Sequence, residues 1–194
     1  MTSCEFTRAE QMIAYFVRHC ERSPGRTRLM KLLYLTDFES RRAMGHPLSE
    51  LKYVWYNHGP YDFSLNAHLR RLSEAGVIEE VCVQYPYGAT GYEYSAGPVE
   101  IPLLFKPEED AVLDYVCRMY STGELRDLLE DVVYETAPMK IAQEQGALGV
   151  ALNMDSVNFE LATALRVPFA TLVQRSAAAR RGEYTSSDAF FAAL

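Results

Sequence analysis

The chain has 194 residues, 48% of them hydrophobic, and a formal net charge of −7. This length supports one substantial hydrophobic core and is short for two full domains. No apolar run approaches the roughly 20 residues that cross a bilayer, and the first residues lack the order of a signal peptide. We therefore expect a cytoplasmic protein without membrane contact.

The charge is distributed unevenly along the chain. Basic side chains slightly outnumber acidic ones in residues 1–76, whereas acidic side chains exceed basic ones by more than two to one in residues 77–194. An acidic second half repels nucleic acid and suits a basic protein partner, although it serves equally well as an ordinary solvated surface.

No known catalytic or metal-binding motif occurs in the sequence. The four cysteines, Cys4, Cys20, Cys82 and Cys117, lie far apart, without a Cys-x-x-Cys pair or the spacing of a zinc site, so we expect reduced thiols. His58 has no nucleophile motif or glycine-rich phosphate loop beside it, and we interpret it as a turn residue. The sequence therefore predicts no enzyme activity, no cofactor and no metal.

Two helices are predicted near the start of the chain. Thr7 and Glu10 have the form of a capping box for a helix that runs to about residue 21. Thr27 is the expected cap of a second helix, through residue 44, which is apolar around most of its circumference and should be buried. Lys31 and Asp37 on this second helix are expected to face polar partners, because burying either one unpaired costs several kcal/mol.

The next elements are short strands around a third helix. Residues 52–56 favour a strand with Tyr53 and Trp55 in the core, ended by a turn at 57–60. The helix after Asp62 or Ser64 has Leu65, Leu69 and Leu72 facing inward and ends at Gly76. Residues 77–84 and 92–95 then form a plausible hairpin.

The rest of the sequence is mainly helical. A helix begins at Pro107, and a second one is predicted with Ser121 and Glu124 as its capping box and Pro138 closing it. Residues 157–166 and 168–181 also favour helices. The pattern predicts an α+β protein, a mainly helical single domain with a small antiparallel sheet or hairpin over residues 1–150, followed by a helical extension and tail over 151–194.

Four short motifs lie in order between residues 31 and 78. They are KLLYLTD at 31–37, GHP at 45–47, HGP at 58–60 after the predicted strand, and LSEAGVI at 72–78. This series resembles the Panacea domain, the family of SocA-like antitoxins often described as phage-associated proteins. A later segment, residues 134–140, resembles the family's Thr or Ser before a Pro-Trp pair, although Met139 stands where Trp is usual.

The resemblance implies a function in a toxin–antitoxin system. Members of the family neutralise a toxin from a neighbouring gene through direct protein–protein contact, and some deliver the toxin to a protease instead. The implied partners are a cognate toxin protein and, as open alternatives, protease machinery or a second copy of the chain.

Aromatic residues supply the candidate contact surface. The chain has 13 tyrosines, several of them between residues 53 and 94. Tyr and Trp are favoured interface anchors because each offers a large, stiff apolar area with a polar tip. The predicted partner-binding residues are Tyr56, His58, Tyr61, Arg70, Tyr85, Tyr87 and Tyr92.

One alternative is a winged-helix-like transcriptional regulator that binds DNA. The Arg70-Arg71 pair lies in a helix that precedes a hairpin, which is an arrangement that can recognise DNA. Glu79, Glu80 and Glu93 in that hairpin would repel phosphates, so we expect nucleic acid to be an unlikely partner.

Overall fold

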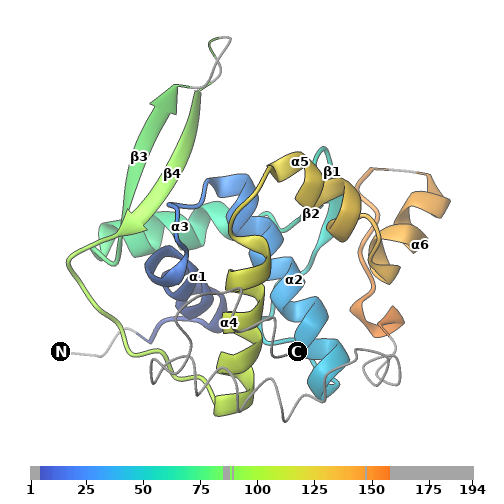
Figure 1. Cartoon of the computed structure of the whole chain (residues 1–194), viewed down its shortest axis with the longest axis horizontal. Coiled ribbons are helices and arrows are strands. Elements are labelled where there is room, and N and C mark those ends of the chain that lie inside the picture. Colours follow the sequence, from blue (N-terminus) through green and yellow to red (C-terminus); the bar gives the residue numbers. More distant parts are fainter. Residues whose placement is uncertain (1–4, 85–87, 89, 147, 158–194) are drawn as a thin grey trace.

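The computed structural model of the chain describes residues 5–84, 88, 90–146 and 148–157. Within these residues six α-helices pack together, and four strands form two separate two-stranded antiparallel sheets (Figure 1). This arrangement confirms the predicted α+β class, a mainly helical single domain with small hairpins. None of the helices in the described segments has the length and apolar character needed to span a bilayer.

Helix α2 (Arg26–Met44) lies at the centre of the fold, as predicted. It contacts α1 (Arg8–His19), α4 (Pro107–Tyr120) and a strand of each hairpin (Figure 1). Its fully buried apolar side chains are Leu29, Met30, Leu32, Leu33, Tyr34 and Leu35. Helix α2 is therefore the common packing partner of two helices and of one strand from each hairpin.

The sequence predicted the last residue of α2 correctly but not its N-cap. The predicted N-cap, Thr27, is wrong. The N-cap is Gly25, and Thr27 lies inside the first turn of the helix. Its end at Gly45 is as predicted, since this glycine takes the left-handed conformation (φ 82°) that closes a helix.

The predicted capping box of α1 is present and is part of a larger network. Glu10 is 1% exposed, and its carboxylate accepts hydrogen bonds from the Thr7 amide (2.8 Å), from Arg71 (2.9 Å) and from His68 (3.2 Å). Burial acts to raise the pKa of Glu10, but these hydrogen bonds and the charge of Arg71 outweigh it and lower the pKa. The network fastens α1 to α3 (Leu65–Glu74).

The first hairpin joins β1 (Val54–Tyr56) to β2 (Gly59–Tyr61), with Val54 opposite Tyr61 and Tyr56 opposite Gly59. The turn predicted at 57–60 is therefore shorter than expected, since Gly59 and Pro60 belong to a strand. Residues 149–152 run along the other edge of β1, where the Trp55 amide donates to the Val150 carbonyl at 2.8 Å. Distant parts of the chain thus cover the edge of this hairpin.

The second hairpin, β3 (Ile78–Gln84) and β4 (Thr90–Ala96), projects away from the helices (Figure 1). It confirms the predicted hairpin, with β4 beginning two residues earlier than expected. Most side chains of β3 are exposed after Ile78, which anchors the base of the arm in the core.

The later helices correct two expectations. Ser121 is the C-cap of α4, and Glu124 precedes α5 (Leu125–Asp127) without a side-chain cap bond, so no capping box forms there. Helix α5 continues as a π-helical segment, η2 (Leu128–Val133), and Pro138 lies in the first turn of α6 (Ala137–Gln145) instead of closing a helix. A proline fits the first turn of a helix because its missing N–H has no partner there.

A short 3-10 helix, η3 (Met154–Ser156), ends the described part of the chain. The helices predicted over 157–166 and 168–181 fall, from residue 158 onward, outside the described residues.

The Glu10 network predicts unequal effects for two glutamates that pair with neighbouring arginines of α3. We expect Glu10→Gln to lower the free energy of unfolding by about 2 kcal/mol, because Arg71 loses its buried counter-ion. Glu74→Gln removes only the exposed Arg70 pair (3.4 Å) and should cost less than about 0.5 kcal/mol.

Urea denaturation at neutral pH measures both changes. The folded pKa of Glu10 lies below its unfolded value, so its contribution is present above the ordinary carboxyl pKa and is lost as the pH falls. Equal effects of the two substitutions at neutral pH would contradict the assignment.

Candidate protein-binding site

Three polar side chains form a buried stripe along α2. Lys31, Tyr34 and Asp37 are spaced three residues apart, which places them on one side of the helix. All three are at most 2% exposed. Each bonds to a different part of the chain, so the stripe determines what lies next to α2.

Asp37 holds the loop after α2 and the start of the first hairpin. Its carboxylate accepts hydrogen bonds from the backbone amides of Leu48 (2.8 Å) and Ser49 (2.7 Å), from the Ser49 hydroxyl, and from the Tyr53 hydroxyl (2.7 Å). Complete burial raises the pKa of Asp37, and these four donors oppose that effect. The predicted polar partners of Asp37 and the predicted burial of Tyr53 are both confirmed.

Lys31 holds the other strand of the same hairpin. Its Nζ donates to the Pro60 carbonyl at 2.6 Å, and burial lowers the pKa of Lys31 to about 7. Gly59 beside it has φ 84°, which disfavours any residue with a side chain, and an added Cβ would lie 3.7 Å from the Lys31 Nζ. Lysine and glycine therefore act together to place β2.

Tyr34 connects the hairpin to the start of α6. Its ring packs edge-on against Tyr53, with centroids 5.3 Å apart. Its hydroxyl lies 2.6 Å from the Thr136 hydroxyl, which donates to the Val133 carbonyl at 2.7 Å, so the Tyr34 hydroxyl is the donor to Thr136. The buried stripe thus fixes both strands of the hairpin and the segment behind it.

The hairpin presents three aromatic rings that pack on one another, Tyr56, Tyr61 and Phe63. Their ring centroids are 5.3 to 5.8 Å apart. Phe63 is 67% exposed and Tyr56 is 42% exposed, whereas Tyr61 is partly buried and accepts a bond from Asn66 at 3.4 Å. We call these three residues the aromatic surface.

Arg26, at the start of α2, contacts three residues of the projecting arm. Its guanidinium lies over the Tyr92 ring at 4.7 Å and bonds to the Tyr94 hydroxyl at 3.2 Å, with Glu80 at 3.5 Å. Burial acts to lower the pKa of Arg26, but Tyr94, Glu80 and Tyr61 together raise it. Arg26 thereby connects the start of α2 with both strands of the projecting arm.

The predicted partner-binding residues lie in several different parts of the chain's structure. Tyr56 and Tyr61 belong to the aromatic surface, and Tyr92 is exposed beside Arg26. His58 is exposed in the hairpin turn, and Arg70 is exposed on α3, one turn after Asn66. Tyr85 and Tyr87 lie outside the described residues.

Sequence reasoning missed two members of this region, Phe63 and Arg26. Phe63 lies between the buried Asp62 and the helix cap Ser64, and the structure leaves it exposed. An aromatic residue in the loop before a helix cap was the available signal. Nothing local in the sequence indicated that Arg26 contacts the hairpin arm.

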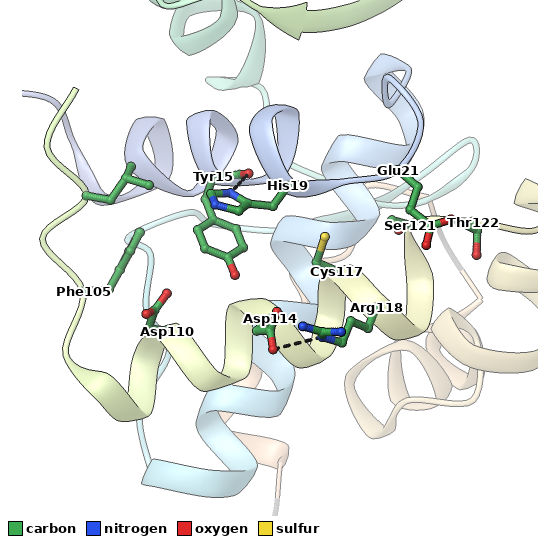
Figure 2. A pocket seen from close by; sticks show the side chains of 11 residues that line it. Tyr15, His19, Glu21, Phe105, Asp110, Asp114, Cys117, Arg118, Ser121 and Thr122 are labelled. Atoms are coloured by element: carbon green, nitrogen blue, oxygen red, sulfur yellow. Dashed lines mark hydrogen bonds and ion pairs between the residues drawn. The ribbon is translucent and has the colours of Figure 1, made fainter. Parts of the chain in front are cut away.

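A separate polar pocket of about 610 Å³ lies between α1 and α4 (Figure 2). Cys117 lines it together with His19, but the His19 ring stacks on Tyr15 and its Nδ1 lies 2.8 Å from the Tyr15 carbonyl oxygen. The Cys117 thiol faces Cys20 instead, and this contact, followed by burial, raises the pKa of Cys117. The pocket therefore holds no activated thiol next to an imidazole base.

Within residues 5–84, 88, 90–146 and 148–157, no group of three His, Cys, Asp or Glu side chains is arranged to bind a metal. These features define a class of protein, a small helical α+β domain that displays aromatic side chains on a rigid support.

The family model for the SocA-like antitoxins, which describes their Panacea domain, matches residues 29–136. The match spans more than half of the chain and contains the buried stripe and the aromatic surface, while Arg26 lies three residues before its start. The chain therefore belongs to the SocA-like, Panacea-domain antitoxin family, which confirms the predicted resemblance and indicates an antitoxin-type role. No curated protein and no solved structure matches the chain.

The buried Lys31 predicts a pH dependence of stability. Its folded pKa of about 7 lies below the ordinary value of 10.5, so between these values the unfolded chain binds more protons than the folded one. The free energy of unfolding should then rise with pH, by up to about 1.4 kcal/mol per pH unit from this group. Lys31→Met should remove this rise.

Urea denaturation at pH 7, 8 and 9 tests this expectation. Lys52→Met, a change at an exposed lysine, serves as the control and should retain the wild-type slope. If Lys31→Met and wild type gain stability with pH at the same rate, Lys31 is not the titrating group.

Proposed function

We propose that this chain is the antitoxin of a toxin–antitoxin pair and neutralises a cognate toxin protein in the cytoplasm by direct binding. The observation that carries the proposal is the aromatic surface of Tyr56, Tyr61 and Phe63, displayed on a hairpin that the buried stripe of α2 fixes from below. The family match over residues 29–136 supports the antitoxin role itself.

The support under the aromatic surface favours tight association. A flexible contact residue loses conformational freedom when it binds, at a cost of about 0.5–1.5 kcal/mol for each immobilised side chain. The three rings already pack on one another, and β2 is held by Lys31. Tyrosine is among the residue types that dominate binding energy at protein interfaces, and phenylalanine is enriched in their buried cores.

A binding role fits the chemistry of the described residues better than catalysis does. SocA-like antitoxins are generally non-enzymatic, and the pocket between α1 and α4 brings no base to the Cys117 thiol. Delivery of the toxin to a protease would use the same aromatic surface for toxin contact, with a second surface for the protease.

Nucleic acid is a poorer partner for this surface. Arg71 is engaged by the buried Glu10, which leaves Arg70 as the exposed member of the pair. Glu79 and Glu80 are exposed on β3, where a winged-helix protein would contact phosphates. The acidic second half of the chain suits a basic protein partner instead.

Co-expression tests the function. The neighbouring gene should arrest growth when expressed alone and be harmless when expressed together with this chain. The purified chain should also inhibit the purified toxin without any protease, which separates direct neutralisation from proteolytic delivery. Absence of both rescue and complex formation would refute the proposal for that neighbour.

Substitution of the aromatic surface tests the site. We expect Phe63→Ala to weaken toxin binding at least about tenfold, since a buried aromatic anchor at an interface is worth more than about 1 kcal/mol. Leu104→Ala is a matched control, because Leu104 is 65% exposed but lies in the loop before α4. Titration calorimetry measures both affinities, and unfolding curves show that both variants remain folded. Equal affinities would exclude the aromatic surface as the contact site.

A further inference from the structure

Two thiols meet where α1 packs against α4. Cys20 is the C-cap residue of α1, and Cys117 lies in the last turn of α4. Their Sγ atoms are 3.4 Å apart although the residues are 97 positions apart in sequence. Figure 2 shows the Cys117 side chain pointing from α4 towards α1.

The two cysteines differ in their exposure to solvent. Cys20 is half-buried, whereas Cys117 is buried but lines the pocket between α1 and α4. Cys117 therefore borders a cavity, and the Cys20 residue is partly exposed. The third described cysteine, Cys82, is exposed on the projecting arm, away from this pair.

The two thiols are also electrostatically unequal. The hydrogen bond from Cys117 lowers the pKa of Cys20 against the effect of burial, and Ser121 and Arg28 lower it further. Arg28 is itself held by the carbonyls of Tyr120 (2.9 Å), Thr122 (3.0 Å) and Gly123 (2.6 Å). Cys20 is thus the thiol more easily ionised, and the thiolate is the form that reacts with oxidants.

We propose that Cys20 and Cys117 form a reversible disulfide when the chain meets hydrogen peroxide, and that this bond fastens α1 to α4. The inference is independent of the proposed antitoxin function. It rests on the contact between the two sulfur atoms and on the position of Cys117 at the wall of the pocket.

The chemistry needs only the two thiols and the oxidant. The Cys20 thiolate attacks one peroxide oxygen, the O–O bond breaks, and Cys20 becomes a sulfenic acid while hydroxide leaves and is protonated to water. The Cys117 sulfur then attacks the Cys20 sulfur, which forms the S–S bond and releases the second water with the thiol proton. Together the two thiols lose two protons and two electrons, and one hydrogen peroxide molecule becomes two water molecules.

The bond should stabilise the folded chain. It closes a long loop in the unfolded state, which is the condition under which a disulfide contributes most. For a chain of this size we expect the melting temperature to rise by about 5 °C or more after oxidation and to return after reduction. Oxidation would thereby slow the opening of the contact between α1 and α4.

The experiment uses the purified, reduced full chain. Treatment with a small excess of hydrogen peroxide at neutral pH should lower the intact mass by 2 Da per disulfide and protect two thiols from alkylation. Digestion should yield one linked peptide pair that contains Cys20 and Cys117. The Cys82→Ser variant should behave like wild type, whereas Cys20→Ser and Cys117→Ser should give no such pair and no rise in melting temperature.

Denatured protein provides the decisive comparison. If the fold brings the two thiols together, the Cys20–Cys117 linkage should form faster in the native chain than in guanidinium, at the same peroxide concentration. The proposal is overturned if both thiols remain open to alkylation after native oxidation, if Cys20 links to another cysteine instead, or if the linkage forms no faster in the folded chain.

Discussion

A carboxylate that is removed from water must find hydrogen-bond donors, and Asp37 finds four of them in the segment that follows α2. Two of these donors are backbone amides and one is the hydroxyl of Tyr53. This single group therefore fixes the path of the chain from the end of α2 to the first strand. Because Asp37 sits on the central helix, an error in its surroundings would displace the whole first hairpin.

The other members of the buried stripe act in the same direction. Lys31 holds β2 through the Pro60 carbonyl, and Tyr34 packs on Tyr53 while it bonds to Thr136 at the start of α6. These interactions give a physical role to the lysine, the tyrosine and the aspartate that lie three residues apart in the KLLYLTD segment. These buried interactions hold the first hairpin in place, and the aromatic surface lies on the exposed side of that hairpin. The buried contacts that hold this hairpin and the exposed aromatic rings thus involve the same short element.

The contact between α1 and α4 has a different character. It contains a polar pocket (Figure 2), the half-buried Cys20 and the buried Cys117, whereas most side chains of α2 are buried against other parts of the chain. Arg28 holds this region by donating to three carbonyls at the end of α4 and just after it, those of Tyr120, Thr122 and Gly123. The molecule therefore combines one tightly packed centre with one contact between helices that borders a polar pocket and contains two thiols.

The sequence by itself determined the local features of this protein. The capping box of Thr7 and Glu10, the burial of α2, the inward leucines of α3 and the end of that helix at Gly76 depend on residues a few positions apart, and all of them were predicted. The ordered motifs between residues 31 and 78 also sufficed to indicate the family that the match over 29–136 shows. The start of α6 was missed because Pro138 serves a helix start as readily as a helix end.

Only the tertiary structure decided which distant residues meet. The pairing of Glu10 with Arg71, the contact of Cys20 with Cys117, the cover of β1 by residues 149–152 and the position of Arg26 beside Tyr92 follow from the packing of many side chains at once. The same packing left Phe63 exposed beside Tyr56 and Tyr61. Local periodicity shows which side of an element is apolar, but it carries no information about which element will cover that side, because that choice depends on the shape of the complete core.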